Sequence, residues 1–232
     1  MSLSRIFLIP SPIAEEAPDS LSPSILEAVK RCQVFFVEDE RTARRFLKKI
    51  WREMVIDDYK WHVIQSKEAP AQFTAALKEN RIIGIISEAG CPGVADPGQE
   101  LIALAQNMKV IVHPLVGPSS ILLALMASGM NGQRFSFMGY LPIDTGKRLK
   151  ALRELEAVSL KERSTQIFIE TPYRNNQVFQ AIMNTCSPKT RLCVAVDITG
   201  KEESIRTMTI AEWKKNTPEL HKKTVIFLVA AF

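Results

Sequence analysis

In the first half of the chain, short runs of β-branched and aromatic residues alternate with longer stretches of helical periodicity, a pattern typical of α/β proteins. Strands are predicted at residues 5–9, 33–37, 82–87 and 109–113. Residues 82–87 are almost entirely apolar, which indicates a strand covered on both faces in a mainly parallel sheet. Ser22 followed by Pro23 predicts a helix with Ser22 as its N-cap, and another helix is expected at about 99–106.

The second half predicts a different order of elements. An apolar helix is expected between Ser120 and Gly129, and a second helix at 147–161. The inward face of the second helix should carry Leu149, Leu152, Leu155 and Val158. Strands are predicted at 135–141, 166–170, 191–198, 204–208 and 224–230. Thr199-Gly200 fits a hairpin, which indicates a mixed sheet. We therefore expect two α/β domains, residues 1–115 and 116–232.

The composition is ordinary for a globular protein, with 46% hydrophobic and 24% charged residues among 232. It excludes disordered, collagen-like and coiled-coil chains. The apolar runs are far shorter than the roughly 20 residues of a membrane span, and no signal peptide is recognised, so a cytoplasmic protein is expected. Four scattered cysteines, three of them expected in the core, indicate neither a disulfide framework nor a metal site. The net charge of +5 permits an anionic partner such as nucleic acid.

A Gly- and Pro-rich segment, residues 87–98, lies where a predicted strand meets a predicted helix. Open α/β sheets bind ligands at this position, and glycine lets the backbone approach a ligand closely. The glycine spacing matches neither the dinucleotide fingerprint nor the Walker A loop. An ordinary βα turn remains the alternative interpretation.

Five loops of this kind follow or end predicted strands: 10–13, 87–98, 117–120, 137–142 and 170–174. A sheet that places those strands side by side would gather the loops on one rim. We therefore expect them to form a cleft.

Several motifs resemble the tetrapyrrole-methylase superfamily, most closely its branch of small-subunit ribosomal RNA cytidine 2′-O-ribose methyltransferases. They are SEAGCPGVADPG at 87–98, GPSS at 117–120, FSFMGYLP at 135–142 and IFIETPYR at 167–174. The resemblance implies two α/β domains, with S-adenosylmethionine in the cleft between them, and a homodimer. It also implies a ribosomal RNA substrate in the small subunit.

The resemblance assigns cofactor binding to residues in the Gly-rich loops and on the later strands. They are Gly90, Gly93, Val94, Asp96, Ser119, Ser120, Met138, Thr171 and Ala230. Alternative interpretations remain open for three of them. Asp96 could be a turn or N-cap carboxylate, and Ser119 and Ser120 could cap the following helix.

Candidate RNA contacts are basic and aromatic side chains beside the same motifs. They are Arg41, Lys147, Arg148, Tyr173 and Arg174. Arg41 belongs to a basic cluster within 41–49 on a predicted helix, and Lys147 and Arg148 open another helix. Such cations contact phosphates, although a solvated helix face is the alternative. Tyr173 could stack on a base.

Transfer of a methyl group to a ribose hydroxyl requires a proton acceptor. Glu38, Asp39 and Glu170 stand at predicted strand ends, but each could equally be a hydrogen-bonded structural carboxylate, so the base stays unassigned. Residues 196–200 lack two basic residues that are usual in the family. This departure keeps two alternatives open, a methyltransferase acting on a tetrapyrrole or other small molecule, and a non-catalytic ligand-binding relative.

Overall fold

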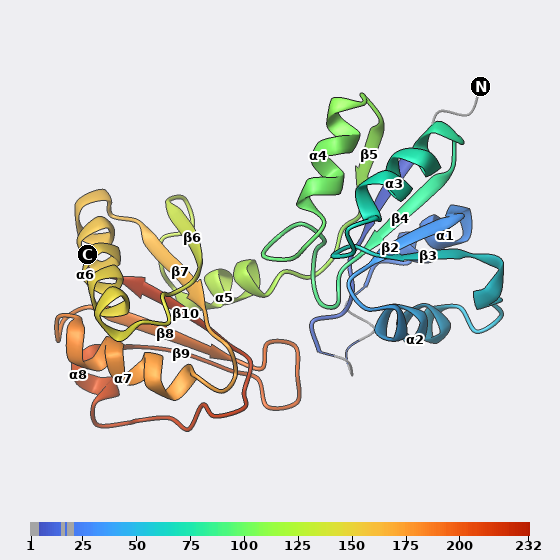
Figure 1. The fold of residues 1–232 in the computed structure, drawn as a ribbon. Helices are drawn as coiled ribbons and strands as arrows, with labels where there is room; N and C mark the ends of the chain where they lie inside the picture. Colours follow the sequence, from blue (N-terminus) through green and yellow to red (C-terminus); the bar gives the residue numbers. More distant parts are fainter. Residues whose placement is uncertain (1–4, 15–16, 18–20) are drawn as a thin grey trace. The chain divides into compact units, whose positions relative to one another are not determined.

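The computed structural model describes residues 5–14, 17 and 21–232, and the chain divides into two compact units, Met1–Ser119 and Ser120–Phe232 (Figure 1). The sequence placed the boundary after residue 115, and the structure divides the chain after Ser119. Glu15 and Glu16, shortly after the first predicted loop at 10–13, lie outside the described residues.

The first unit contains a parallel sheet with the strand order β3-β2-β4-β1-β5. Its strands are β1 (Arg5–Ile9), β2 (Val34–Val37), β3 (Lys60–Val63), β4 (Ile82–Ile86) and β5 (Ile111–Pro114). All neighbouring pairs are parallel, so the carboxyl ends of the five strands lie at one edge. This confirms the expected parallel sheet, although β3 was not predicted.

Helices cover both faces of this sheet, as the apolar character of β4 predicted. Helices α1 (Ser24–Arg31) and α2 (Glu40–Ile50) pack with Phe35 and Val37 on one face. Helices α3 (Ala69–Lys78) and α4 (Gln99–Asn107) pack with Phe36 on the other. A short 3₁₀ helix, η2, spans Ile56–Asp58.

The second unit contains a mixed sheet with the strand order β6-β7-β10-β8-β9. Its strands are β6 (Phe135–Tyr140), β7 (Thr165–Ile169), β8 (Arg191–Val196), β9 (Ser204–Thr209) and β10 (Val225–Ala230). Strands β6 and β7 are parallel, and the other neighbouring pairs are antiparallel. The predicted hairpin at Thr199-Gly200 is confirmed, because β8 and β9 pair on either side of it.

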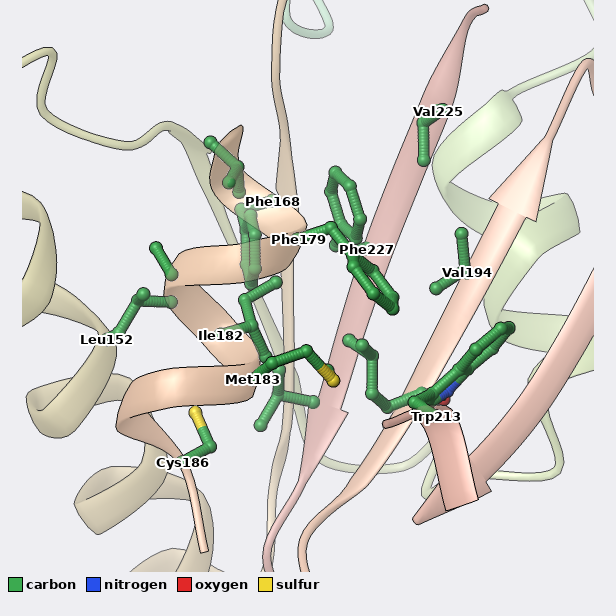
Figure 2. Close-up of a cluster of buried hydrophobic side chains, with 14 of the residues drawn as sticks. Leu152, Phe168, Phe179, Ile182, Met183, Cys186, Val194, Trp213, Val225 and Phe227 are labelled. Carbon is green, nitrogen blue, oxygen red and sulfur yellow. The ribbon is translucent and has the colours of Figure 1, made fainter. Parts of the chain in front are cut away.

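Helices also cover this second sheet. Helices α6 (Thr145–Glu162), α7 (Asn175–Thr185) and α8 (Ile210–Trp213) enclose one core cluster, in which Phe168 stacks on Phe227 and Phe179 meets Trp213 edge to face (Figure 2). Helix α5 (Ser120–Ser128) contacts β8, β9 and β10.

Two helix predictions need correction. Val158 is 38% exposed rather than inward, and the buried stripe of α6 runs through Arg148, Leu152, Leu155 and Ser159. The N-cap of α1 is Pro23 rather than the predicted Ser22, because the helix begins one residue later, at Ser24. The Ser22 Oγ still accepts a hydrogen bond from Ser24 N at 3.3 Å.

Three cysteines, Cys32, Cys186 and Cys193, lie in the core as expected, and burial raises the pKa of each thiol. Among the helices of the described residues, none combines the length and the apolar character needed to cross a membrane.

Candidate functional site

The five Gly/Pro-rich loops do not share one rim, because their strands belong to two different sheets. The loops 10–13, 87–98 and 117–120 follow β1, β4 and β5 at the carboxyl edge of the first sheet. The loops 137–142 and 170–174 lie at the ends of β6 and β7 in the second sheet. The predicted division into two domains was itself inconsistent with a single rim, because it places the loops 137–142 and 170–174 in the second domain.

In the first unit, Ser11 joins the first loop to the long Gly-rich loop. Its backbone amide donates to Gly90 O at 2.9 Å, and Gly90 N donates back to Ser11 O at 3.0 Å. The Ser11 hydroxyl donates to Ser87 O at 2.7 Å, and the Ser87 hydroxyl donates to Gly90 O at 3.0 Å. Gly90 has a φ of +74°, which favours glycine over other residues. These bonds fix the start of the Gly-rich loop.

Cys91 and Gly117 bring the third loop onto the other two. The Cys91 thiol donates to Pro118 O at 3.4 Å. A Cβ added to Gly117 would lie 2.2 Å from side-chain carbons of Pro10, so only glycine allows this approach. Three loops far apart in sequence therefore form one cluster, as expected for strands β1, β4 and β5.

Three carboxylates interact beside this cluster. Glu38, directly after β2, accepts a hydrogen bond from Glu88 N at 3.4 Å. Burial and the charges of Asp96 and Glu88 raise the pKa of Glu38 to about 7, although the Glu88 amide opposes this. Burial and the charge of Glu88 raise the pKa of Asp96 to about 6. Glu38 therefore exchanges protons near neutral pH, which suits a general base.

The neighbouring Asp39 has a different role. It is the N-cap of α2 and accepts a hydrogen bond from Thr42 N at 2.7 Å, which lowers the pKa of its carboxyl. Asp39 is thus the structural carboxylate that sequence reasoning kept as an alternative, whereas Glu38 is not held by a helix cap. The sequence alone could not distinguish the roles of these two adjacent acidic residues, because the difference lies in their hydrogen-bond partners.

The remaining cofactor candidates of the first unit lie along the same loops. Gly93 has a φ of +77°, and the Val94 side chain next to it is 49% exposed. Asp96 is not the N-cap of α4, since Gly98 occupies that position. Ser119 ends the third loop.

In the second unit, the ends of β6 and β7 lie at one edge of the sheet because these strands are parallel. Met138 is 52% exposed and Tyr140 is 60% exposed, next to a shift in the strand register and a φ of +67° at Gly139. Thr171 is exposed after β7. The structure therefore brings Met138 and Thr171 to the same sheet edge.

Glu170 is a structural carboxylate in the β7–α7 connection. It is 5% exposed, and its Oε2 lies 2.9 Å from Arg174 Nη2. Its Oε1 accepts a hydrogen bond from Thr171 N at 2.7 Å. Arg174 is thus occupied by this ion pair, whereas Tyr173 is 69% exposed and its ring makes a T-shaped contact with the ring of His221.

Ala230 does not lie with Met138 and Thr171. Strand β10 is antiparallel to β7, and Val229 pairs with Gln166 near the start of β7. Ala230 is therefore at the opposite edge of the sheet, and it is also 1% exposed. Ala230 therefore lies apart from these two cofactor candidates of the second unit, and its assignment as a cofactor contact stays a prediction.

Lys147 and Arg148, adjacent in sequence, have different environments. Lys147 is exposed in the first turn of α6. Arg148 is 6% exposed, and its guanidinium donates to Ile143 O at 2.9 Å. This hydrogen bond fixes the connection between β6 and α6. Because the Arg148 guanidinium is buried and already bonded, its position does not favour contact with a phosphate. Among the described residues, no group of three metal-ligating side chains was found.

The family of Tetrapyrrole (Corrin/Porphyrin) Methylases matches residues 16–214. This chain belongs to that family. It is 32% identical over 205 residues to a ribosomal RNA small subunit methyltransferase I of Mesorhizobium japonicum, covering 88% of this chain and 67% of the relative. It is 26% identical to the protein of that name from Pseudomonas aeruginosa, covering 100% and 80%. The chain is therefore a methyltransferase.

Solved structures show the same fold. The methyltransferase CobJ matches with a TM-score of 0.65 at 16% identity, covering 98% of this chain and 94% of that one. Uroporphyrin-III C-methyltransferase from Thermus thermophilus, in complex with S-adenosylhomocysteine, matches with a TM-score of 0.58 at 14% identity, covering 98% and 97%. These matches confirm the predicted architecture of two α/β domains.

Proposed function

We propose that this protein transfers a methyl group from S-adenosylmethionine to a ribose 2′-hydroxyl of small-subunit ribosomal RNA. The observation that carries the proposal is its similarity, over most of the chain, to relatives named ribosomal RNA small subunit methyltransferase I. Such an enzyme works where ribosomes assemble, so the proposal includes a cytoplasmic location. It also includes a homodimer, which light scattering at a known concentration can test.

The loop cluster of the first unit fits a cofactor without phosphates. Gly90 and Gly93 present backbone groups with no side chain in the way, and Val94 adds exposed apolar surface. We assign cofactor contacts to these residues and to Asp96 and Ser119 in the first unit. In the second unit we assign them to Ser120, Met138 and Thr171. When bound, S-adenosylmethionine supplies the methyl group.

We assign the proton transfer to Glu38. Its carboxylate accepts the ribose proton, because its raised pKa gives it both forms near neutral pH. Arg41, Lys147 and Tyr173 are exposed, and we assign them to RNA contacts. We assign Arg148 to positioning the start of α6, which carries Lys147, and Arg174 to positioning the β7–α7 connection, which carries Tyr173.

Thermal unfolding with S-adenosylhomocysteine tests the cofactor. A ligand at about 100 times its dissociation constant stabilises by roughly 2.7 kcal/mol, which raises the Tm by about 5–10 °C here. ATP and NAD should give no shift. An absent shift, or one with ATP or NAD, would contradict cofactor binding. Transfer of labelled methyl groups to small ribosomal subunits from cells without this enzyme then tests the acceptor.

A further inference from the structure

The cations of helix α2 have distinct environments. Arg44 pairs with Glu40 at 2.6 Å, and its guanidinium lies 5.1 Å from the centre of the Trp61 ring. The Lys48 ammonium donates to two carbonyl oxygens just beyond the helix, at 2.6 and 2.9 Å. These two cations therefore stabilise the first unit. Arg45 and Lys49, one turn apart on the exposed side of α2, both line a pocket.

This pocket lies between α2 and the loop that follows β1, and its volume is about 350 Å³. Pro12, Ile13 and Phe46 form apolar walls, while Arg45 and Lys49 add positive charge. The Glu88 carboxylate is the acidic group of the lining. An apolar slot with cations beside it matches a planar base attached to a phosphate, because the base needs apolar contact and the phosphate needs charge.

The inner wall of the pocket is continuous with the candidate cofactor loop. Ser11 and Ser87 line the pocket, and both are hydrogen-bonded to Gly90 within the same unit. A molecule seated in the pocket is thus held against the loop that we assign to the cofactor. This position distinguishes the pocket from a basic surface remote from the chemistry.

We propose that this pocket holds one unpaired nucleotide of the RNA substrate, with its base between Ile13 and Phe46 and its phosphate on Arg45 and Lys49. The inference rests on the proposed function and adds a subsite to it. A nucleotide held here must be extruded from the base stack, since the walls would occupy the two faces of the base that its neighbours cover in an RNA helix.

The test compares two double variants with the same loss of charge. Arg45→Gln/Lys49→Gln removes the phosphate contacts, and Lys60→Gln/Lys78→Gln removes two exposed lysines that do not line the pocket. Titration with cytidine 5′-monophosphate, cytidine and inorganic phosphate measures the pocket directly. Wild type should bind the nucleotide more tightly than cytidine or phosphate, and only the pocket variant should lose this binding, by at least tenfold.

Single-stranded RNA binding at several salt concentrations provides a second measurement. The logarithm of the binding constant for RNA falls linearly as the logarithm of the salt concentration rises. Loss of one phosphate contact in the pocket variant should make this negative slope shallower by about 0.7. Thr42→Phe, which narrows the pocket without changing charge, should weaken RNA binding without changing that slope. Equal losses in both double variants, or unchanged nucleotide binding in the pocket variant, would overturn the proposal.

S-adenosylhomocysteine binding and methyl transfer separate failure of the subsite from failure of the proposed function. Methyl transfer by wild type, together with an unchanged KM for RNA in the pocket variant, means that the function stands and the subsite is wrong. Nucleotide binding lost in the pocket variant, with no transfer to RNA by wild type, means that the pocket is real and the proposed function is wrong. Retained S-adenosylhomocysteine binding in every variant shows that the fold is intact.

Discussion

Glu38 links stability and proposed activity at the scale of one residue. Its pKa is about 7 in the folded protein and 4.5 as the ordinary value, so folding takes up a proton between these pH values. The free energy of unfolding therefore falls as pH rises from about 4.5 to 7. Above pH 7 the folded protein retains a carboxylate that its surroundings disfavour.

Glu38→Gln should therefore stabilise the protein at pH 8, by about 1 kcal/mol after allowance for solvent screening at a half-exposed side chain. Near pH 4.5 the variant and wild type should be similar. Urea unfolding at both pH values measures the difference. Glu53→Gln, at an exposed position, is the control and should change stability by less than about 0.5 kcal/mol. Destabilisation at pH 8 would contradict the raised pKa.

The same substitution should impair catalysis if Glu38 accepts the ribose proton. We expect the single-turnover rate constant of methyl transfer to fall by about 10²–10⁴-fold and the rise in rate around pH 7 to disappear. Single-turnover methyl transfer to ribosomal subunits between pH 5.5 and 9 measures both effects. Asp39→Ala should instead lower the free energy of unfolding by about 1 kcal/mol, because the N-cap of α2 is lost, with the pH profile unchanged. A retained pH profile in Glu38→Gln would assign the proton to another group.

At the scale of elements, strand β4 depends on a close contact with β2 and β1. A Cβ added to Gly84 would lie 2.7 Å from the Phe35 ring and 2.9 Å from Ile9. Gly84→Ala should therefore destabilise the protein by about 1–3 kcal/mol through overpacking, measured by urea unfolding. Gly132→Ala has open space around the new methyl group and should change stability by less than about 0.5 kcal/mol. Equal losses of stability in Gly84→Ala and Gly132→Ala would contradict the close packing of Gly84 against Phe35 and Ile9.

Helix α6 is attached to the end of the chain by a buried hydroxyl. Ser159 is 0% exposed, and its Oγ accepts a hydrogen bond from Ala231 N at 2.9 Å. Ser159→Ala should lower the free energy of unfolding by about 1–2 kcal/mol, because the amide loses its partner. Val158→Ala, one residue away on the exposed side, should have a smaller effect in the same urea titration. A larger loss of stability in Val158→Ala than in Ser159→Ala would contradict the burial seen here and support the inward Val158 predicted from sequence.

At the scale of the whole molecule, each unit has its own sheet and hydrophobic core. We expect residues 120–232 to fold when expressed alone. Trp213, 3% exposed with its indole N–H 2.8 Å from Leu192 O, is the single tryptophan of this fragment. Its fluorescence should show one cooperative urea transition. A solvent-exposed emission spectrum without denaturant would mean that this unit needs residues 1–119 to fold.

Many features of the fold were predictable because they depend on local patterns. Residues 82–87 carried the signature of a covered strand, and the segment around Thr199-Gly200 identified a hairpin. By contrast, β3, α3 and α7 were not predicted. The four residues of β3 are partly exposed with mixed polarity, so their pairing with β2 rather than their own sequence makes them a strand.

The sequence by itself determined the α/β class, the mixed second sheet, the family motifs and the candidate loops, since hydrophobic periodicity and turn residues act over short distances. Only the tertiary structure decided which loops meet, because sheet order is a long-range property. It placed Ser11 against Gly90 and separated Ala230 from Thr171. It also distinguished Glu38 from Asp39, because hydrogen-bond partners and burial, rather than residue type, set the pKa of a carboxylate.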